Sequence, residues 1–228
     1  TVAENLSVVR SRITSACAAS GRPPDSVRLL AISKTKPEAL VREAIKSGQL
    51  DFGENYLQDA IPKIEALPDA TWHFIGRIQS NKTRQIANHF DWVHSLASLK
   101  VARRLSDQRE RDVPLNVLIQ VNVSDDTAKD GIRPDQAREL IDQIADLHQL
   151  KLCGLMTITE QTNDITAQRL YFRRLADLLI HLQCETGLEH FSELSMGMTR
   201  DLEPAIEEGA TWVRVGTAIF GARSDLSQ

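Results

Sequence analysis

The sequence predicts a (β/α)8 barrel preceded by one extra helix. Short apolar runs recur about eight times along the 228 residues, and segments with helical spacing separate them. Strands that alternate with helices form parallel sheets, and strands that are apolar along their whole length are covered by helices on both faces. Eight such units in about 200 residues fit a closed barrel better than two open sheets. A doubly wound open sheet shares this local pattern and differs only in closure, so it remains the alternative.

The extra helix is predicted at the amino-terminal end, over residues 1–20. Thr1 and Glu4 fit a capping box, and the segment GRPPD that begins at Gly21 ends the helix. Five residues between them follow a helical apolar spacing: Val2, Leu6, Val9, Ile13 and Cys17. This helix precedes the first strand, so it lies outside the eightfold repeat.

The strand-like runs set the order of the barrel. The first run is VRLLAIS, and Pro37 and Gly48 mark the start and the end of the helix that follows it. The runs begin at Val27, Leu50, Trp72, Trp92, Leu115, Leu150, His190 and Thr211. The clearest helix covers residues 165–184 and is stopped by Gly187. Because no long linker or low-complexity tract interrupts this pattern, we expect residues 1–228 to form a single domain.

Composition excludes several classes of protein. The chain has 27 Lys and Arg residues against 31 Asp and Glu residues, a net charge of −4, whereas binding to a phosphate backbone needs clustered positive charge. We therefore expect no nucleic-acid partner. No apolar stretch approaches the roughly 18 residues of a membrane-spanning helix, and the N-terminus lacks the layout of a signal peptide. We expect a cytoplasmic protein with no membrane partner, whose cysteines, Cys17, Cys153 and Cys184, are reduced core thiols.

The ends of the predicted strands give a shortlist of functional residues. In a parallel barrel, reactive side chains lie at the carboxyl ends of the strands, and phosphate groups bind in the loops after the last two strands. Here these loops contain SMGMT, residues 195–199, and GTAIFG, residues 216–221. Glycine lets backbone N–H groups approach an oxyanion closely, and hydroxyl groups add neutral donors. The earlier strands end in Lys34, Glu54, Asn55, Arg77, His94, Ser95, Asn122 and Met156.

The alternation of side chains between the two faces of a strand places Arg214 in the mouth of the barrel. Val213 and Val215 share the face of the eighth strand that suits the surrounding helices, so Arg214 and Gly216 share the inner face. A buried guanidinium needs an acceptor or an anion. Parity alone leaves two roles equally open for Arg214, which are binding of an anion and a structural ion pair with a carboxylate such as Glu193.

Lys34 ends the first strand in the segment LLAISKTKP. A lysine after a strand is ordinarily a solvated loop charge, and we expect this of Lys36. Lys34 differs because it faces the two glycine-bearing loops and Arg214. A lysine desolvated near a second cation has a lowered proton affinity, which favours formation of a Schiff base with an aldehyde.

Other motifs do not define a site. Ala222 follows the loop 216–221 where a nucleotide-binding P-loop needs lysine. The histidines match no ligand spacing, so we expect no metal. Ser95 and His94 are neighbours in a strand and point to opposite faces, so they cannot act as nucleophile and base. His73 is expected to be a hydrogen-bonded core residue.

The segments LLAISKTKP, FGENY, WHFIGRIQSNK, GLMTI and ELSMGMTRDLEPAIEEGATWVRVGTAIFG occur in this order along the chain. Together they resemble the pyridoxal phosphate homeostasis protein family, which is related to the barrel domain of alanine racemase. The similarity runs from about Val27 to Gly221, which covers essentially the whole barrel. The resemblance implies that pyridoxal 5′-phosphate (PLP) is the cofactor and that it forms a Schiff base with Lys34.

The resemblance also assigns the remaining contacts of PLP. Ser195, with the backbone of Gly216 and Thr217, would hold the phosphate. Arg214 would approach the pyridine nitrogen, and Asn55 and Met196 would line the ring pocket. These residues coincide with the ends of the predicted strands, although the strand pattern by itself does not name the cofactor.

The resemblance implies a carrier or buffer of PLP inside the cell, not an enzyme. Arginine is a permanent donor, so Arg214 facing the ring nitrogen would leave that nitrogen unprotonated and the ring a weaker electron sink. A racemase needs acid–base groups on both faces of its substrate, and Tyr171 falls in a predicted helix far from the strand ends. We therefore assign no catalytic residue. A PLP-dependent, racemase-like enzyme is the alternative, and a lysine Schiff-base aldolase without PLP is a third.

A carrier role implies apo-enzymes that use PLP as partners. The chain as given ends soon after the eighth predicted strand, without the second domain through which related racemases dimerise, so we expect a monomer. Lys129, in the irregular segment 124–131, is a second lysine that aldehyde could reach, although an exposed loop lysine usually remains unreacted.

Overall fold

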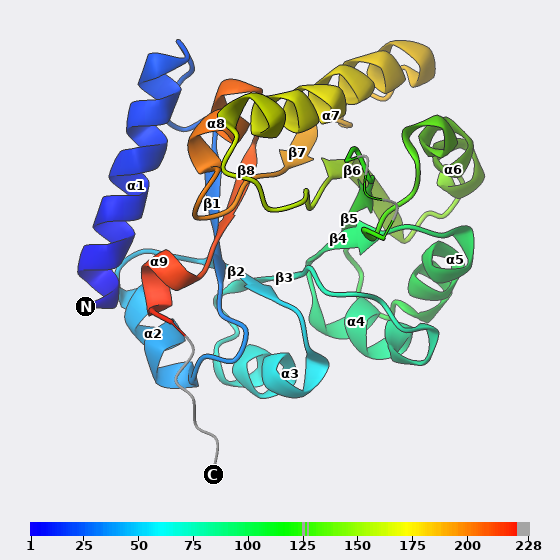
Figure 1. Ribbon diagram of the computed structural model, residues 1–228. Coiled ribbons are helices and arrows are strands. Elements are labelled where there is room, and N and C mark those ends of the chain that lie inside the picture. Colours follow the sequence, from blue (N-terminus) through cyan, green and yellow to red (C-terminus); the bar gives the residue numbers. More distant parts are fainter. Residues whose placement is uncertain (125, 127, 223–228) are drawn as a thin grey trace.

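Eight parallel strands form a closed ring surrounded by helices in the computed structural model, which describes residues 1–124, 126 and 128–222 (Figure 1). The strands pair in chain order, and the eighth pairs with the first. They are β1 (Arg28–Ile32), β2 (Asp51–Glu54), β3 (Thr71–Phe74), β4 (Trp92–Leu96), β5 (Leu115–Gln120), β6 (Leu150–Met156), β7 (Glu193–Ser195) and β8 (Trp212–Val215). The predicted (β/α)8 barrel is confirmed, and the open-sheet alternative is wrong.

Helices connect consecutive strands and cover the outside of the barrel. They are α2 (Glu38–Lys46), α3 (Leu57–Ala66), α4 (Thr83–His89), α5 (Leu99–Gln108), α6 (Ala137–Ile144), α7 (Ile165–Thr186) and α8 (Leu202–Glu207), with short turns η1 (Ser80–Lys82) and η2 (Pro134–Gln136) before α4 and α6. One further turn of helix, α9 (Thr217–Phe220), follows β8. Among the described residues, no helix combines the length and apolar character needed to cross a membrane.

The extra amino-terminal helix, α1 (Val2–Ala19), packs against α2, α8 and α9. Thr1 and Glu4 form the expected capping box. The buried face of α1 carries the predicted apolar stripe, including Leu6 and Cys17. Since α9 immediately follows β8, α1 covers the outside of the barrel where its two ends meet.

The two faces of β8 separate as strand parity predicts. Val213 and Val215 belong to the hydrophobic cluster shared with the helices. Trp212 belongs to a separate cluster with Leu30 and Ile32 of β1, which pack inside the barrel. The pairing of β1 with β8 brings Leu30 opposite Arg214, so Arg214 lies on the inner face.

Aromatic rings fill the barrel interior on the side of the strand beginnings. His73 stacks on Trp92 at 5.5 Å between ring centroids and meets the edge of Trp212 at 4.9 Å. The guanidinium of Arg28, at the start of β1, lies 3.9 Å from the ring centroid of Trp212. His73 is fully buried and hydrogen-bonded, as expected. This end of the barrel is filled with side chains, so an open site must lie at the carboxyl ends of the strands.

The expected core cysteines are only partly confirmed. Cys17 and Cys153 are buried, whereas Cys184 is exposed. The buried side of α7 passes through Leu175, Leu179 and Leu182, and Cys184 lies off this stripe. The prediction of a core thiol at position 184 is therefore wrong.

Candidate functional site

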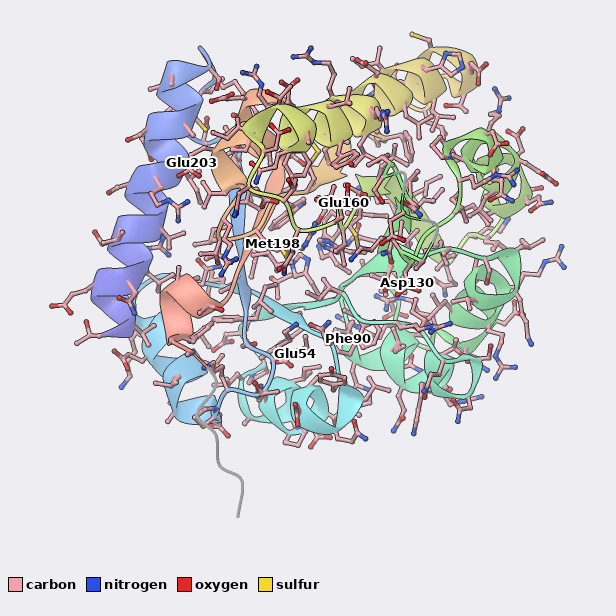
Figure 2. The ribbon with its side chains drawn as sticks, in the orientation of Figure 1. Glu54, Phe90, Asp130, Glu160, Met198 and Glu203 are labelled. Carbon is pink, nitrogen blue, oxygen red and sulfur yellow. The ribbon has the colours of Figure 1, made fainter. Side chains whose placement is uncertain are left out.

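A cavity of about 400 Å³ opens at the carboxyl ends of β1, β6, β7 and β8. Four of the predicted cofactor-binding residues line it: Lys34, Arg214, Gly216 and Thr217. Figure 2 labels Glu160 and Met198, two further lining residues that lie over the middle of the ring of helices. The cavity thus brings together the Lys34 amine, the guanidinium groups of Arg200 and Arg214 and the glycine-bearing end of β8.

A tight turn presents Lys34. The Lys36 N–H donates to the Ser33 carbonyl at 3.0 Å, and Thr35 between them has a φ of 59°. A β-branched residue with a left-handed φ is strained, at a cost of about 1–3 kcal/mol, so the surrounding contacts must hold the turn in place. Lys34 is half-buried at this turn, in contact with the cavity.

A buried ion pair between Lys63 and Glu54 holds the backbone of this turn at Ser33. The Lys63 Nζ donates to the Ser33 carbonyl at 2.8 Å and to Glu54 Oε1 at 2.7 Å, and the Ser33 hydroxyl donates to the same carboxylate oxygen at 2.7 Å. Burial raises the pKa of Glu54, although the positive charge of Lys63 and the two hydrogen bonds oppose that rise. The pair therefore fixes the residue that directly precedes Lys34.

Arg214 is held by neutral groups. Its side chain is 3% exposed, and it donates from Nη1 to Ser195 Oγ at 2.9 Å and from Nη2 to the Thr157 carbonyl at 2.8 Å. Burial lowers the pKa of Arg214 to about 10, still well above neutrality, so the guanidinium is a cation. Glu193 pairs instead with Arg28 at 2.5 Å, so the structural ion pair considered for Arg214 and Glu193 is wrong.

The loop after β7 forms the opposite wall of the cavity through Met198, Thr199 and Asp201. Gly197 has a φ of 91°, and a Cβ there would lie 2.5 Å from Ala205 Cβ, so only glycine fits. Asp201 Oδ1 accepts from the Met198 N–H at 2.6 Å and closes the turn. Burial raises the pKa of Asp201, and the charge of Arg214 opposes this effect. The loop therefore offers the Thr199 hydroxyl to the cavity on a fixed backbone.

Gly216 brings the end of β8 against the end of β1. A Cβ at this position would lie 3.2 Å from both Ile32 Cβ and the Ile32 carbonyl oxygen, which is tighter than ordinary contact. Lys34 follows Ile32 by two residues. The absence of a side chain at Gly216 therefore keeps the backbone of the last loop close to the turn that carries Lys34.

Three predicted residues do not line this cavity. Ser195 and Met196 are fully buried at the end of β7. Asn55, at the end of β2, lines two neighbouring hollows, one beside α3 and α4 and one beside the ends of β3 and β4. Its buried Oδ1 has no hydrogen-bond partner among the described residues. Direct contacts of Ser195, Met196 and Asn55 with a ligand stay predictions.

The loop between β6 and α7 supplies a wall that the sequence did not indicate. Thr159 and Glu160 of this loop line the cavity, as does Gln168 in the first turn of α7, and the Tyr171 hydroxyl of α7 donates to Glu160. The expectation that Tyr171 lies far from the strand ends is therefore wrong. The signal was present, because the segment TITEQTN directly follows the sixth strand and is rich in polar side chains.

Lys129 lies outside the cavity, in a loop where residues 125 and 127 fall outside the described part of the chain. The described residues contain no group of three or more His, Cys, Asp or Glu side chains placed to hold a metal ion. The cavity is therefore lined by one amine, two guanidinium groups of which that of Arg214 is buried, threonine and amide side chains, and two carboxylates.

A family model described as the alanine racemase N-terminal domain matches residues 4–224. The chain therefore belongs to that family of barrels. Alanine racemase from Corynebacterium glutamicum has a TM-score of 0.69 at 15% identity over 100% of this chain and 62% of that chain, so it shares the fold.

Within this family the similarity is to pyridoxal phosphate homeostasis proteins. The protein of that name from Pseudomonas aeruginosa is 54% identical over 98% of this chain and 96% of its own length. The one from Escherichia coli K12 is 45% identical over 97% of both chains. The family resemblance expected from the sequence is confirmed.

A solved relative carries the cofactor that the sequence implied. PipY of Synechococcus elongatus, solved without PLP, has a TM-score of 0.87 at 39% identity, covering 97% of this chain and 100% of that chain. The structure of the same protein with PLP bound has a TM-score of 0.86 at 38% identity, with the same coverage.

Proposed function

We propose that this protein binds PLP in the cavity at the carboxyl ends of β1, β6, β7 and β8 and acts as a carrier or buffer of the cofactor in the cytoplasm. The observation that carries the proposal is the meeting of Lys34 and Arg214 in one cavity with the glycine-bearing end of β8. The family of PLP homeostasis proteins to which the chain belongs, and the PLP bound to PipY, support the choice of ligand.

The chemistry of the lining residues fits PLP. The cofactor carries an aldehyde, a phosphate and a pyridine nitrogen, and bound PLP supplies an electrophilic carbon. Lys34 would bind it covalently, since a primary amine adds to an aldehyde, forms a C=N bond and releases water. Arg214 keeps its charge when buried, so it would donate to a ring nitrogen and would not accept a proton from it.

The phosphate would lie between the loops after β7 and β8. Gly216 and Thr217 line the cavity from one side and Thr199 from the other, which supports backbone and hydroxyl donors for an oxyanion. Ser195 remains part of the proposed site through its bond to Arg214. Met196 beside it and Asn55 on the rim are proposed to complete the surroundings of the ring.

We propose a non-enzymatic role because the relatives are named for homeostasis and because Arg214 is a poor partner for carbanion chemistry. The racemase-like alternative has one observation in its favour, which is Glu160 in the cavity with the Tyr171 hydroxyl bonded to it. Holoprotein incubated with single enantiomers of amino acids distinguishes the two roles. Inversion beyond one equivalent per chain would establish the enzyme.

Borohydride reduction tests the binding site. Purified protein mixed with PLP should absorb in the visible range, and reduction followed by peptide mapping should find the label on Lys34. Lys34→Ala should lose the label. Lys36→Ala is the matched control, because Lys36 donates to the Gly221 and Ala222 carbonyls and does not line the cavity. A wild type that stays unlabelled, or that is labelled elsewhere, would exclude the proposal.

The proposal extends to partners and assembly. We propose apo-enzymes that use PLP as recipients, a monomeric state, and residues 1–228 as a single PLP-binding domain. Gel filtration with light scattering measures the mass of the holoprotein against the 25.5 kDa of one chain. Activation of a PLP-free apo-enzyme by holoprotein, with free PLP trapped by excess competing amine, measures transfer.

A further inference from the structure

A chain of hydrogen bonds runs through the barrel interior and ends at Arg214. Asp51 Oδ1, at the start of β2, lies 3.0 Å from His73 Nε2, and His73 Nδ1 lies 3.0 Å from His94 Nε2. His94 Nδ1 lies 2.8 Å from Ser195 Oγ, which accepts from Arg214 Nη1 at 2.9 Å. In this chain of hydrogen bonds, Asp51 is half-exposed and the other four residues are buried.

The carboxylate sets the direction of every bond. As a carboxylate, Asp51 only accepts, so His73 Nε2 carries the hydrogen. A neutral imidazole then accepts at its other nitrogen, so His94 Nε2–H donates to His73 Nδ1. By the same reasoning His94 Nδ1 accepts, and its donor is the Ser195 hydroxyl. The Ser195 oxygen is left with its lone pairs for the guanidinium of Arg214.

The environment supports two neutral rings. Burial lowers the pKa of His73, although Asp51 and Asp91 oppose the effect. Burial lowers the pKa of His94 well below its usual value, and the positive charges of Arg214 and Arg28 add to it. The stacking of His73 on Trp92 and its edge-on contact with Trp212 restrict rotation of its ring, so the bonds keep their direction.

The opposite direction of the hydrogen bonds, from Asp51 as donor towards Ser195, leaves an unsuitable group at each end. It would need a hydrogen on Asp51, which is half-exposed to water, and it would turn His94 into a donor to Ser195. The Ser195 hydroxyl would then need another acceptor, because Arg214 only donates. Among the contacts that the structure gives for Ser195 Oγ, His94 and Arg214 are the partners. The forward direction gives each of the four hydrogen bonds one donor and one acceptor.

We propose that Asp51, His73 and His94 are positioning residues that hold the Ser195 hydroxyl as an acceptor and thereby fix the guanidinium of Arg214 in the cofactor site. The inference rests on the proposed function in naming the ligand of Arg214. It also gives Ser195 an indirect role, because its hydrogen is committed to His94 and not to a phosphate. In the loops after β7 and β8, Thr199 and Thr217 are then the hydroxyl-bearing residues that line the cavity, and Thr159 and Thr162 line it after β6.

The tautomers of His73 and His94 test the predicted direction of the hydrogen bonds without any cofactor. Two-bond proton–nitrogen correlation spectra of the full chain with labelled histidine, assigned through His73→Gln and His94→Gln, report which ring nitrogen carries hydrogen. We expect both rings neutral with hydrogen on Nε2 at neutral pH. Hydrogen on Nδ1 of either ring, or a charged ring, would overturn the proposal whether or not PLP binds.

Variants at His94 test the effect on the site. His94→Phe removes the acceptor for Ser195 at similar volume, and we expect the Kd for PLP to rise about tenfold, with a changed absorption maximum of the bound cofactor. His94→Gln keeps an acceptor and a donor, so its Kd and spectrum should return close to those of the wild type. Ser95→Ala is the control, since it removes a bond from the same strand to the Gly76 carbonyl.

The outcomes separate the two proposals. A His94→Phe protein that folds, by circular dichroism and thermal melting, and binds PLP as the wild type does would overturn the positioning role. An equal loss in His94→Phe and His94→Gln would also overturn it, because the packing of the ring alone would then matter. If neither the wild type nor any variant binds PLP, the proposed function fails. The tautomer measurement alone then tests the direction of the hydrogen bonds from Asp51 to Arg214.

Discussion

Two buried cations lie at the carboxyl end of the barrel, and they differ in whether a carboxylate compensates their charge. Lys63, on α3, is 6% exposed and forms an ion pair with Glu54 at 2.7 Å. Arg214, on β8, is 3% exposed and binds a serine hydroxyl and a backbone carbonyl. Among the described residues, no carboxylate comes within ion-pair distance of Arg214, and Asp201 acts on it only through space.

This difference distinguishes a residue that supports the backbone, Lys63, from a residue that lines the cavity, Arg214. A buried charge is expensive unless a partner compensates it, and the compensated pair at Lys63 holds the backbone of the turn before Lys34. Arg214 keeps a positive charge that no ion pair among the described residues compensates, with hydrogen bonds to neutral groups and the more distant carboxylate of Asp201 around it. We infer that charge balance distinguishes the groups that support this site from those that bind its ligand.

Loss of the carboxylate at Glu54 should have the largest effect. Glu54→Leu leaves the charge of Lys63 buried without a partner, so we expect the free energy of unfolding to fall by about 3–5 kcal/mol. Urea denaturation followed by circular dichroism measures this change. Glu54→Leu combined with Lys63→Met removes both charges and should recover most of the loss. A single variant as stable as the wild type would show that the pair is not a scaffold.

Loss of the cation at Arg214 should affect binding more than stability. Arg214→Met removes the charge-assisted bond to the cofactor, worth about 1.5–3 kcal/mol, so the Kd for PLP should rise about 10- to 100-fold. The fold should lose less than Glu54→Leu loses, because an uncompensated buried charge disappears with the side chain. Titration of the visible absorbance and urea denaturation of the same samples give both numbers. A large loss of stability with unchanged Kd would place Arg214 in the scaffold.

The fold and the inner face of β8 were accessible from the sequence because both depend on local periodicity. Repeating apolar runs predicted the barrel, and the alternation of Val213, Arg214 and Val215 predicted the inward guanidinium. Lys34 and Gly216 follow from strand ends alone, and the structure places both at one cavity. The name of the ligand came only from the family resemblance.

Pairings between distant strands were not accessible. His94 and Ser195 lie 101 residues apart on β4 and β7, and they meet because the closed barrel brings these strands to face each other across its interior. Glu54 was recognised only as a strand end, and its partner Lys63 resembles an ordinary surface charge of a helix in the sequence, so the buried pair was not predicted either. Such contacts depend on the stagger of the strands, which no local pattern specifies.

The smallest expected effect concerns the neutral support of Arg214. His94 has a folded-state pKa well below its usual 6.5, so the unfolded chain takes up a proton below that pH while the folded chain does not. Stability tied to His94 is therefore fully present above pH 6.5 and is lost as the pH falls below it. Between about pH 6.5 and 5.5 this loss amounts to about 1 kcal/mol for one histidine.

His94→Gln has no titrating group at this position, so its stability should fall by about 1 kcal/mol less than that of the wild type over this pH range. Urea denaturation at a series of pH values measures the difference. His73→Gln, measured in parallel, gives the contribution of the neighbouring histidine that is hydrogen-bonded to His94. Identical slopes would mean that His94 takes up a proton in the folded state as readily as in the unfolded chain, so that it becomes charged below about pH 6.5 in both. The barrel would then hold a second cation beside Arg214, and the contrast with the compensated charge of Lys63 would no longer rest on a neutral interior.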